Sequence, residues 1–201
     1  MTEAGWNRHF PQPQTPAFSE SACRFMMNRC GRVPVMRKVG EATYENSEGL
    51  RDGRISDTAF NIARGTMRML AQLSFAPLLE VGLANGRRAD ILAIGPKGEI
   101  WIVEVKSCLA DFRADGKWPD YDAYCDRFLF AVDSDFPCGV LPADTGLIIA
   151  DRYSAEIIRP GESKALGAAR RKAVTLRFSR VAAQRVHRQV DPSSGVPNES
   201  G

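Results

Sequence analysis

Apolar side chains gather in two short runs near the middle of the chain, over residues 87–94 and 99–107. Ile, Leu, Val and Trp dominate both runs, and these residue types favour a pleated, buried surface. The segment between the runs, Gly95-Pro96-Lys97-Gly98, has the residue types of a turn. The pattern therefore predicts a β-hairpin, or two neighbouring strands joined by a tight connection.

The pattern on either side of these two runs predicts a layered fold. Apolar positions at helical spacing predict a helix over residues 56–72, Pro119 can open a second helix, and residues 166–190 are expected to be helical in two pieces. Polar alternation is weak in the later strands, which indicates that both of their faces are covered. We therefore expect an α/β fold, a three-layer sandwich with a mixed central β-sheet. Further strands are expected at residues 76–83, 128–132, 146–150 and 155–159, with a tight turn at Asn85-Gly86.

Composition separates a folded domain from two ends. The chain has 201 residues, 44% hydrophobic and 25% charged, which suits one globular domain. Residues 1–53 are rich in Pro, Ser, Gln and Asn and are expected to form a poorly ordered extension, residues 54–190 the domain, and residues 191–201 a disordered tail. No apolar run approaches the ~20 residues that span a bilayer, and no signal-peptide pattern is present, so we expect a cytoplasmic protein without a membrane partner.

Cysteine and histidine usage excludes several kinds of site. The five cysteines are scattered and form no C-x-x-C pair, so neither a zinc site nor a redox dithiol is indicated. The two histidines, His9 and His187, lie near opposite ends of the chain. A histidine-based metal site or a Ser-His hydrolase is therefore poorly supported.

Three charged side chains lie within the two central apolar runs and carry the candidate chemistry. Side chains alternate across a strand with a period of two, so Glu104 and Lys106 point to one face, where Asp90 can meet them if the strands pair in suitable register. Charged groups in apolar strands are costly unless they are paired or bind a metal. Carboxylate oxygens suit Mg²⁺ or Mn²⁺, and a nearby lysine suits a phosphate and an attacking water. The alternative is a solvated face of an antiparallel sheet.

Basic residues are unevenly distributed and offer candidate contacts to DNA. Residues 159–188 contain nine Lys or Arg residues and one acidic residue, Glu162, so this segment is either a solvated helix face or a phosphate-binding surface. An aromatic and basic segment near residue 120 either lines a nucleic-acid groove or packs onto the sheet. The candidate DNA contacts are Arg64, Arg87, Arg88, Lys117, Trp118, Tyr121, Arg170, Arg171 and Lys172.

The central hairpin resembles the PD-(D/E)XK nucleases of the restriction-endonuclease-like superfamily. Asp90 matches the lone Asp of that motif, Glu104-Val105-Lys106 matches the (D/E)-x-K, and the order of elements is similar to the superfamily's αβββαβ core. Two departures are present. Ala89 stands where the motif has Pro, and the helix over residues 56–72 lacks the Glu that many members carry as an additional ligand.

A run of linked motifs also resembles the MmcB-related bacterial DNA repair proteins, over residues 58–192. This resemblance implies a DNA repair role, a nuclease-type fold, DNA as a partner and other repair proteins as further partners. The motifs are Gly86-Arg87-Arg88-Ala89-Asp90, Glu104-Val105-Lys106-Ser107, Asp111-Phe112, Asp115-x-Lys117-Trp118-Pro119-x-Tyr121, Cys125-Asp126-Arg127 and Phe130-Ala131-Val132.

Together the resemblances imply a Mg²⁺-dependent nuclease, with Mn²⁺ as an alternative metal, that acts on damaged or branched DNA. Asp90 and Glu104 would hold the metal, with the Val105 carbonyl as a third ligand and Glu80 in place of the missing carboxylate. Lys106 would orient the attacking water or stabilise negative charge on the phosphate. Two alternatives remain: a module of this fold that binds DNA without cutting it, and an adaptor in which the charged cluster is only a structural network.

Overall fold

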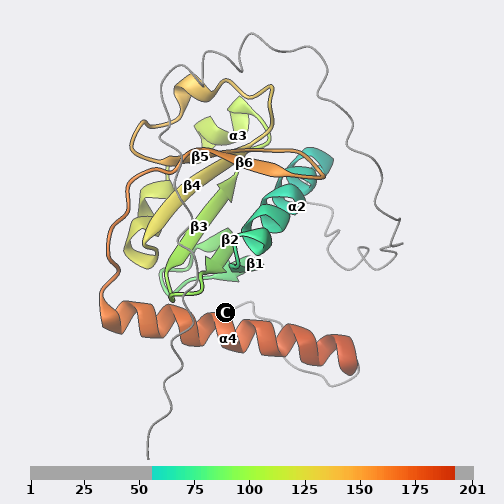
Figure 1. Ribbon diagram of the computed structural model, residues 1–201, viewed down its shortest axis with the longest axis vertical. Helices are drawn as coiled ribbons and strands as arrows, with labels where there is room; N and C mark the ends of the chain where they lie inside the picture. Colours follow the sequence, from blue (N-terminus) through green and yellow to red (C-terminus); the bar gives the residue numbers. More distant parts are fainter. Residues whose placement is uncertain (1–55, 193–201) are drawn as a thin grey trace, which may run out of the picture. The chain divides into compact units, whose positions relative to one another are not determined.

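A computed structural model describes residues 56–192, which form a six-stranded mixed sheet packed against helices (Figure 1). The strands follow one another across the sheet in chain order. β1, β2 and β3 are antiparallel, β3, β4 and β5 are parallel, and β6 returns antiparallel to β5. The expected α/β fold with a mixed sheet is therefore confirmed. The strands are β1 (Ala76–Gly82), β2 (Arg88–Ile94), β3 (Ile100–Val105), β4 (Arg127–Val132), β5 (Gly146–Ala150) and β6 (Ala155–Arg159).

Some predictions fall outside these limits. The expected disorder of residues 1–53 and of the tail beyond residue 192 lies outside the described residues. Within them, no helix combines the length and the apolar character needed to cross a membrane.

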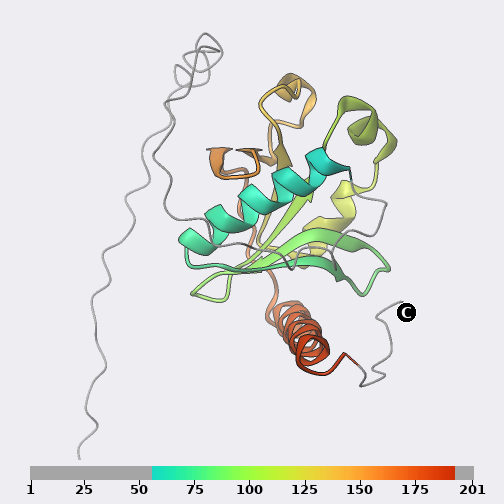
Figure 2. The same ribbon diagram turned by 90° about the vertical axis from the view of Figure 1, so that its right-hand side faces the viewer.

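Helix α2 (Asp57–Gln72) covers one face of the sheet, as its apolar spacing predicts. The Ser56 hydroxyl accepts a hydrogen bond from the Ala59 N–H at 3.2 Å and so caps the first turn. The buried side of α2, with Ile62 and Leu70, packs against residues of β2 to β5 such as Val103. Figure 2 shows α2 lying along this face, with α4 on the opposite side of the sheet.

Aromatic side chains fill the core on the other face. Phe128 and Phe130 of β4 meet edge to face with centroids 5.0 Å apart, and the 3-10 helix η2 (Trp118–Tyr124) lays Tyr121 against Phe128. Short segments α3 (Leu109–Ala114) and η3 (Cys138–Val140) follow β3 and β4. The helix predicted to open at Pro119 is thus a 3-10 helix, with proline near its start.

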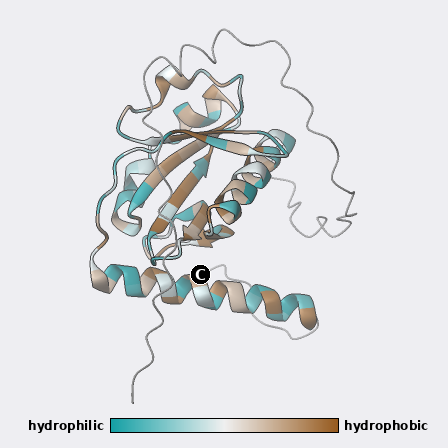
Figure 3. Cartoon of the chain, viewed as in Figure 1, coloured by the Kyte–Doolittle hydropathy of each residue, from teal (hydrophilic) through white to brown (hydrophobic). Residues whose placement is uncertain are grey.

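The last helix, α4 (Ala168–Val190), is continuous, so the prediction of two helical pieces is wrong. No Gly or Pro interrupts these residues, which leaves no local reason for a break. Only Val174 and Val181 are buried on α4, and Figure 3 shows hydrophilic and hydrophobic residues mixed along it, in contrast with the hydrophobic strands. Apolar burial alone therefore holds α4 weakly.

Arginines attach α4 to the edge strand β1. Arg185 donates to the carbonyl oxygens of Leu79 and Glu80, the latter at 2.9 Å, and Arg177 donates to the carbonyl of Gly82. Hydrogen bonds that carry a charge are stronger than neutral ones. Much of the basic character of this helix thus serves to hold it to the sheet.

Candidate functional site

The candidate site lies where strands β2 and β3 separate. Their ladder ends at the pair Ile91 and Val103. One residue beyond this pair, the Asp90 carboxylate accepts a hydrogen bond from the Val105 N–H at 2.8 Å. The side chain of Asp90 thus takes the place of a backbone carbonyl as the acceptor for this N–H. This bond fixes Asp90 against the segment that carries Glu104, so the hairpin itself builds the first half of the site.

Lys106 follows directly after β3 and is almost fully buried, with 4% of the residue exposed. Its backbone N–H donates to the Ala131 carbonyl at 2.9 Å, which continues the pairing with β4. Its amino group lies 3.4 Å from Glu104 Oε1 and 2.5 Å from Asp115 Oδ2. The structure therefore brings Glu104 and Lys106 together, as the period of two predicted, and the register of β2 and β3 places Asp90 near them.

Burial makes both carboxyl groups reluctant to ionise. Desolvation raises the pKa of Glu104 to about 8, and the nearby charge of Asp90 adds to this effect. Desolvation likewise raises the pKa of Asp90 to about 6, although the hydrogen bond from Val105 and the charge of Lys106 oppose it. Two carboxylates side by side in a buried site are unfavourable without more positive charge than one lysine provides.

Lys106 is held as a cation. Burial opposes its charge, but the hydrogen bond to Asp115 and the charge of Glu104 outweigh burial and raise its pKa. For Asp115, burial is likewise outweighed by the bond and charge of Lys106, which lower its pKa. A protonated amine can stabilise an anion but cannot accept a proton.

The site has the donor chemistry that a hard cation requires. Glu104 Oε2 is buried and has no hydrogen-bond partner, which is costly for a carboxylate oxygen. Mg²⁺ and Mn²⁺ prefer such oxygen ligands, and Mg²⁺ usually keeps several waters. Within residues 56–192, however, no group of three or more His, Cys, Asp or Glu residues is arranged to hold a metal. The part of the chain that the structure describes thus offers two carboxylates at this site, Asp90 and Glu104, and not a complete set of metal ligands.

Glu80 lies on the neighbouring strand in an unusual backbone conformation. Its φ is +53°, a left-handed value that is uncommon outside glycine. Its carboxylate pairs with Arg88 at 2.9 Å, and its charge contributes to the raised pKa of Asp90. Glu80 is therefore close enough to influence Asp90, while its own ion pair engages it elsewhere.

Asp115 was not singled out as a site residue from the sequence, and Tyr121 was assigned a different role. Asp115, just after α3, holds Lys106, and the signal for it is general: a buried lysine requires an acidic partner. Tyr121 was expected in a DNA groove, but its hydroxyl donates to the Arg88 carbonyl at 3.0 Å beneath the site. Burial raises the pKa of Tyr121, and the charge of Glu104 raises it further.

The ring of Tyr121 lies in the core and not in an open groove. Its residue is 5% exposed, and its ring stacks on Phe128 with centroids 5.8 Å apart. Trp118 is half-buried and stacks on the same Phe128 ring at 5.6 Å. The aromatics near residue 120 therefore pack onto the sheet, which was the alternative for this segment.

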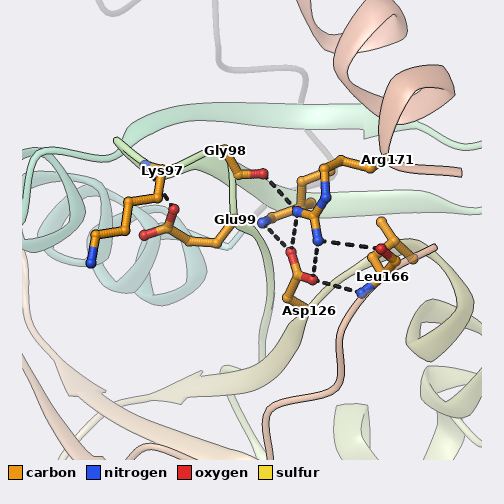
Figure 4. Close-up of polar contacts among 7 residues, drawn as sticks. Lys97, Gly98, Glu99, Asp126, Leu166 and Arg171 are labelled. Carbon is orange, nitrogen blue, oxygen red and sulfur yellow. Dashed lines mark hydrogen bonds and ion pairs between the residues drawn. The ribbon is translucent and has the colours of Figure 1, made fainter. Parts of the chain in front are cut away.

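Arg171 also contributes to packing instead of an open surface. Asp126 accepts two bonds from its guanidinium, at 2.6 and 2.7 Å, and further bonds from the N–H groups of Ile100 and Leu166 at 2.7 and 2.8 Å. Arg171 in turn donates to the Gly98 carbonyl at 2.7 Å (Figure 4). Asp126 therefore joins the start of β3 to the first turns of α4, and Arg171 is the link.

The other basic candidates differ in their contacts and in their exposure to solvent. Arg87 pairs with Asp120 at 2.8 Å, and Arg170 lies over the ring of Tyr124, 4.7 Å from its centroid. Lys117 and Lys172 are exposed, and Arg64 is half-buried on α2. Among these candidates, Lys117 and Lys172 are therefore the exposed lysines.

Comparison with known proteins gives one family and one solved structure. The family model described as MmcB-like, DNA repair protein MmcB-like, matches residues 46–193. A solved structure of a protein of unknown function from Silicibacter pomeroyi is 43% identical, with a TM-score of 0.68, and the match covers 72% of this chain and 99% of that chain. None of the curated proteins matches.

Proposed function

This chain belongs to the MmcB-like family of DNA repair proteins, and on that premise we propose that it is a Mg²⁺-dependent nuclease that hydrolyses phosphodiester bonds of damaged or branched DNA. One observation carries the proposal. The half-buried carboxylate of Asp90 and the buried carboxylate of Glu104 lie near a single cationic lysine, and one oxygen of Glu104 has no partner. A bound divalent cation would balance the charge and engage that oxygen.

The order of elements supports a restriction-endonuclease-like core. Helix α2 precedes the antiparallel strands β1 to β3, and β4 then pairs parallel with β3 after the short helical segments α3 and η2. This is the αβββαβ order that the resemblance implies. The acidic residues stand at the open end of the β2–β3 hairpin, away from its turn, where that resemblance expects the catalytic motif.

Each residue has a distinct role in the proposed reaction. Asp90 of β2 and Glu104 of β3 would hold the metal, with the Val105 carbonyl of β3 as a further ligand. When bound, Mg²⁺ polarises the scissile phosphate and lowers the pKa of a water. Lys106 stays protonated and stabilises the negative charge that builds on the phosphate, because Asp115 and Glu104 raise its pKa. Exposed Lys117 contacts the DNA backbone.

The test is cleavage of a panel of DNA substrates (single-stranded, duplex, flapped and branched) with Mg²⁺ or Mn²⁺. We expect Glu104→Gln and Lys106→Met to lower the rate by about 10²–10³-fold, the range for loss of one preorganised electrostatic group. Glu156→Gln, an exposed carboxylate on β6, is the matched control and should cut at the normal rate. Cleavage that is unaffected by Glu104→Gln and Lys106→Met would overturn the assignment.

A second candidate function is DNA recognition without hydrolysis. Two observations favour it: Lys106 is already held by Asp115 at 2.5 Å, and the described residues lack a cluster of three metal ligands. Binding of repair intermediates that persists in EDTA, with no cleavage of any substrate in the panel, would select this function over the nuclease.

A further inference from the structure

The turn between β5 and β6, residues 151–154, presents an aromatic ring to solvent. Tyr153 is 67% exposed, which is unusual for a large ring beside a well-packed sheet. The guanidinium of Arg152 lies over this ring, 5.2 Å from its centroid. The two side chains form one unit, with a flat aromatic surface and a positive charge.

The backbone of this turn is held firmly. Asp151 Oδ1 accepts hydrogen bonds from the N–H groups of Tyr153 and Ser154, both at 2.7 Å. The Asp151 N–H donates to the Ser154 carbonyl at 3.0 Å. Because these bonds leave the turn little freedom, Tyr153 is displayed in a fixed position and loses little entropy on binding a partner.

Helix α2 supports the turn from below. Arg68 donates to the carbonyls of Arg152 and Tyr153 at 3.3 and 3.4 Å. Gly65 lies so close that a side chain there would collide with the backbone of Asp151 and Ser154. The absent side chain at Gly65 therefore allows the turn to rest on α2.

The turn lies at the same edge of the sheet as the candidate site. Strands β3, β4 and β5 are parallel, so their carboxyl ends meet at one edge. Lys106 follows β3 at that edge and the turn follows β5, with one strand between them. The turn rests on α2, whereas Glu104 alternates with Val103 and Val105 and so points to the aromatic face of the sheet, so a strand that reaches both must pass over the edge. In Figure 1, α3 and the β5–β6 segment lie at the same end of the sheet.

Three arginines lie on or near the turn. Arg152 lies over the ring, Arg68 donates to carbonyls of the turn, and Arg64 is one helical turn from Arg68 on α2. Asp151 is the only carboxylate in the turn, and its Oδ1 atom is occupied by the backbone. A rigid exposed ring among arginines is the combination with which proteins bind single-stranded nucleic acid, where bases stack and phosphates are neutralised.

We propose that residues 151–154 form a stacking platform for an unpaired base of single-stranded DNA. The base stacks on Tyr153, and Arg152, Arg68 and Arg64 neutralise the adjacent phosphates. The platform rests on the proposed function, since it assumes DNA as the partner, and it specifies the substrate: DNA with a single-stranded segment. Fully paired duplex has no free base to offer.

The experiment measures binding of the full chain to fluorescent oligonucleotides, single-stranded and duplex, at one low salt concentration. We expect Tyr153→Ala to weaken single-strand binding about tenfold and duplex binding less than twofold, in keeping with the value of one base–aromatic stack. Tyr153→Trp should restore single-strand binding. Leu176→Ala, a similarly exposed residue on α4, is the control and should leave both affinities unchanged.

A 2-aminopurine base in the single strand reports stacking directly, because its fluorescence falls when it stacks. Quenching by the wild type that Tyr153→Ala abolishes supports the platform. Equal single-strand affinity and equal quenching for wild type and Tyr153→Ala overturn it, even if Glu104→Gln still lowers the cleavage rate. Loss of self-association in Tyr153→Ala with unchanged DNA binding overturns it in favour of a contact between copies. Absence of any DNA binding by the wild type overturns both proposals.

Discussion

The amino group of Lys106 lies 2.5 Å from Asp115 Oδ2, closer than its 3.4 Å approach to Glu104. The lysine of the central motif is thus positioned chiefly by a residue outside that motif. Asp115 also accepts a hydrogen bond from the Lys117 N–H at 3.2 Å, which fixes the carboxylate in the loop after α3. The loop after α3 and the hairpin therefore share one ion pair.

Asp115→Asn is expected to destabilise the protein by about 1–3 kcal/mol, because Lys106 keeps its buried charge and loses its best partner. The lower end applies if water reaches the pair, since Asp115 is partly exposed. Urea denaturation near neutral pH measures the change. Asp111→Asn, an exposed carboxylate on α3, should be nearly neutral. A loss for Asp115→Asn no larger than for Asp111→Asn would mean that the pair contributes little.

Stability of the metal-free protein should fall as pH rises. The folded protein keeps protons on Asp90 up to about pH 6 and on Glu104 up to about pH 8, whereas the unfolded chain releases them near pH 4. Folded molecules therefore bind more protons through this window, so each step upward in pH favours unfolding. Melting temperature measured in EDTA from about pH 5 to pH 8 tests the sign. Glu104→Gln should flatten the decline, since it removes the main titrating group.

Mg²⁺ should reverse that decline. A metal that binds only the folded, ionised site stabilises it by mass action, and protons compete with it. The rise in melting temperature with Mg²⁺ is therefore expected to be larger at about pH 8 than near pH 5. Asp90→Asn should lose the rise, and Glu156→Gln on β6 should keep it. An equal Mg²⁺ effect in Asp90→Asn would argue against a metal at this site.

Asp126→Asn should destabilise the protein by about 2–4 kcal/mol, since it weakens a paired arginine contact that joins β3 and α4. The bond with Arg171 helps to lower the pKa of Asp126 against the effect of burial, so this stabilisation is present above the unfolded pKa and is lost as pH falls. Chemical denaturation at two pH values tests both points. Arg171→Lys should cost less stability than Asp126→Asn, because the lysine keeps the positive charge beside Asp126 and loses only the two-pronged geometry.

Lys172→Ala separates DNA contact from packing. Lys172 is exposed next to Arg171 and has no described role in docking α4. The variant should retain wild-type stability and should bind DNA of every sequence more weakly. The slope of the logarithm of the binding constant against the logarithm of the salt concentration should be smaller by about one. A titration at several salt concentrations provides the measurement. An unchanged salt slope would remove Lys172 from the DNA surface.

Gly65→Ala tests the support beneath the β5–β6 turn. A methyl group there meets backbone atoms that cannot rotate away, so we expect a loss of at least about 1–3 kcal/mol. Gly116→Ala is the matched control, because open space surrounds that glycine and its backbone is not left-handed. That control should be neutral or slightly stabilising. Equal stability of the two variants would show that the turn can move off α2.

The sequence predicted the elements where a local pattern controls the structure. The period of two placed Glu104 and Lys106 on one face, and the glycine turns at 86 and 98 adopt the positive φ that their hairpins need. The sequence could not choose between an aromatic groove and packing onto the sheet, because the stacking of Trp118 and Tyr121 on Phe128 depends on how η2 folds back against β4, which spacing does not reveal. Asp115 was missed as a site residue for the same reason, since its importance depends on where α3 returns the chain.

The bonds from Arg177 and Arg185 to carbonyls of β1 have a consequence for how the protein behaves in a crowded solution. β1 is the terminal strand of the sheet, and an uncovered terminal strand can recruit a strand from another molecule. Because arginines of α4 occupy these carbonyl oxygens, α4 protects β1 from pairing with a strand of another molecule. A chain shortened before α4 should therefore precipitate or form fibrils under conditions in which the full chain stays dispersed.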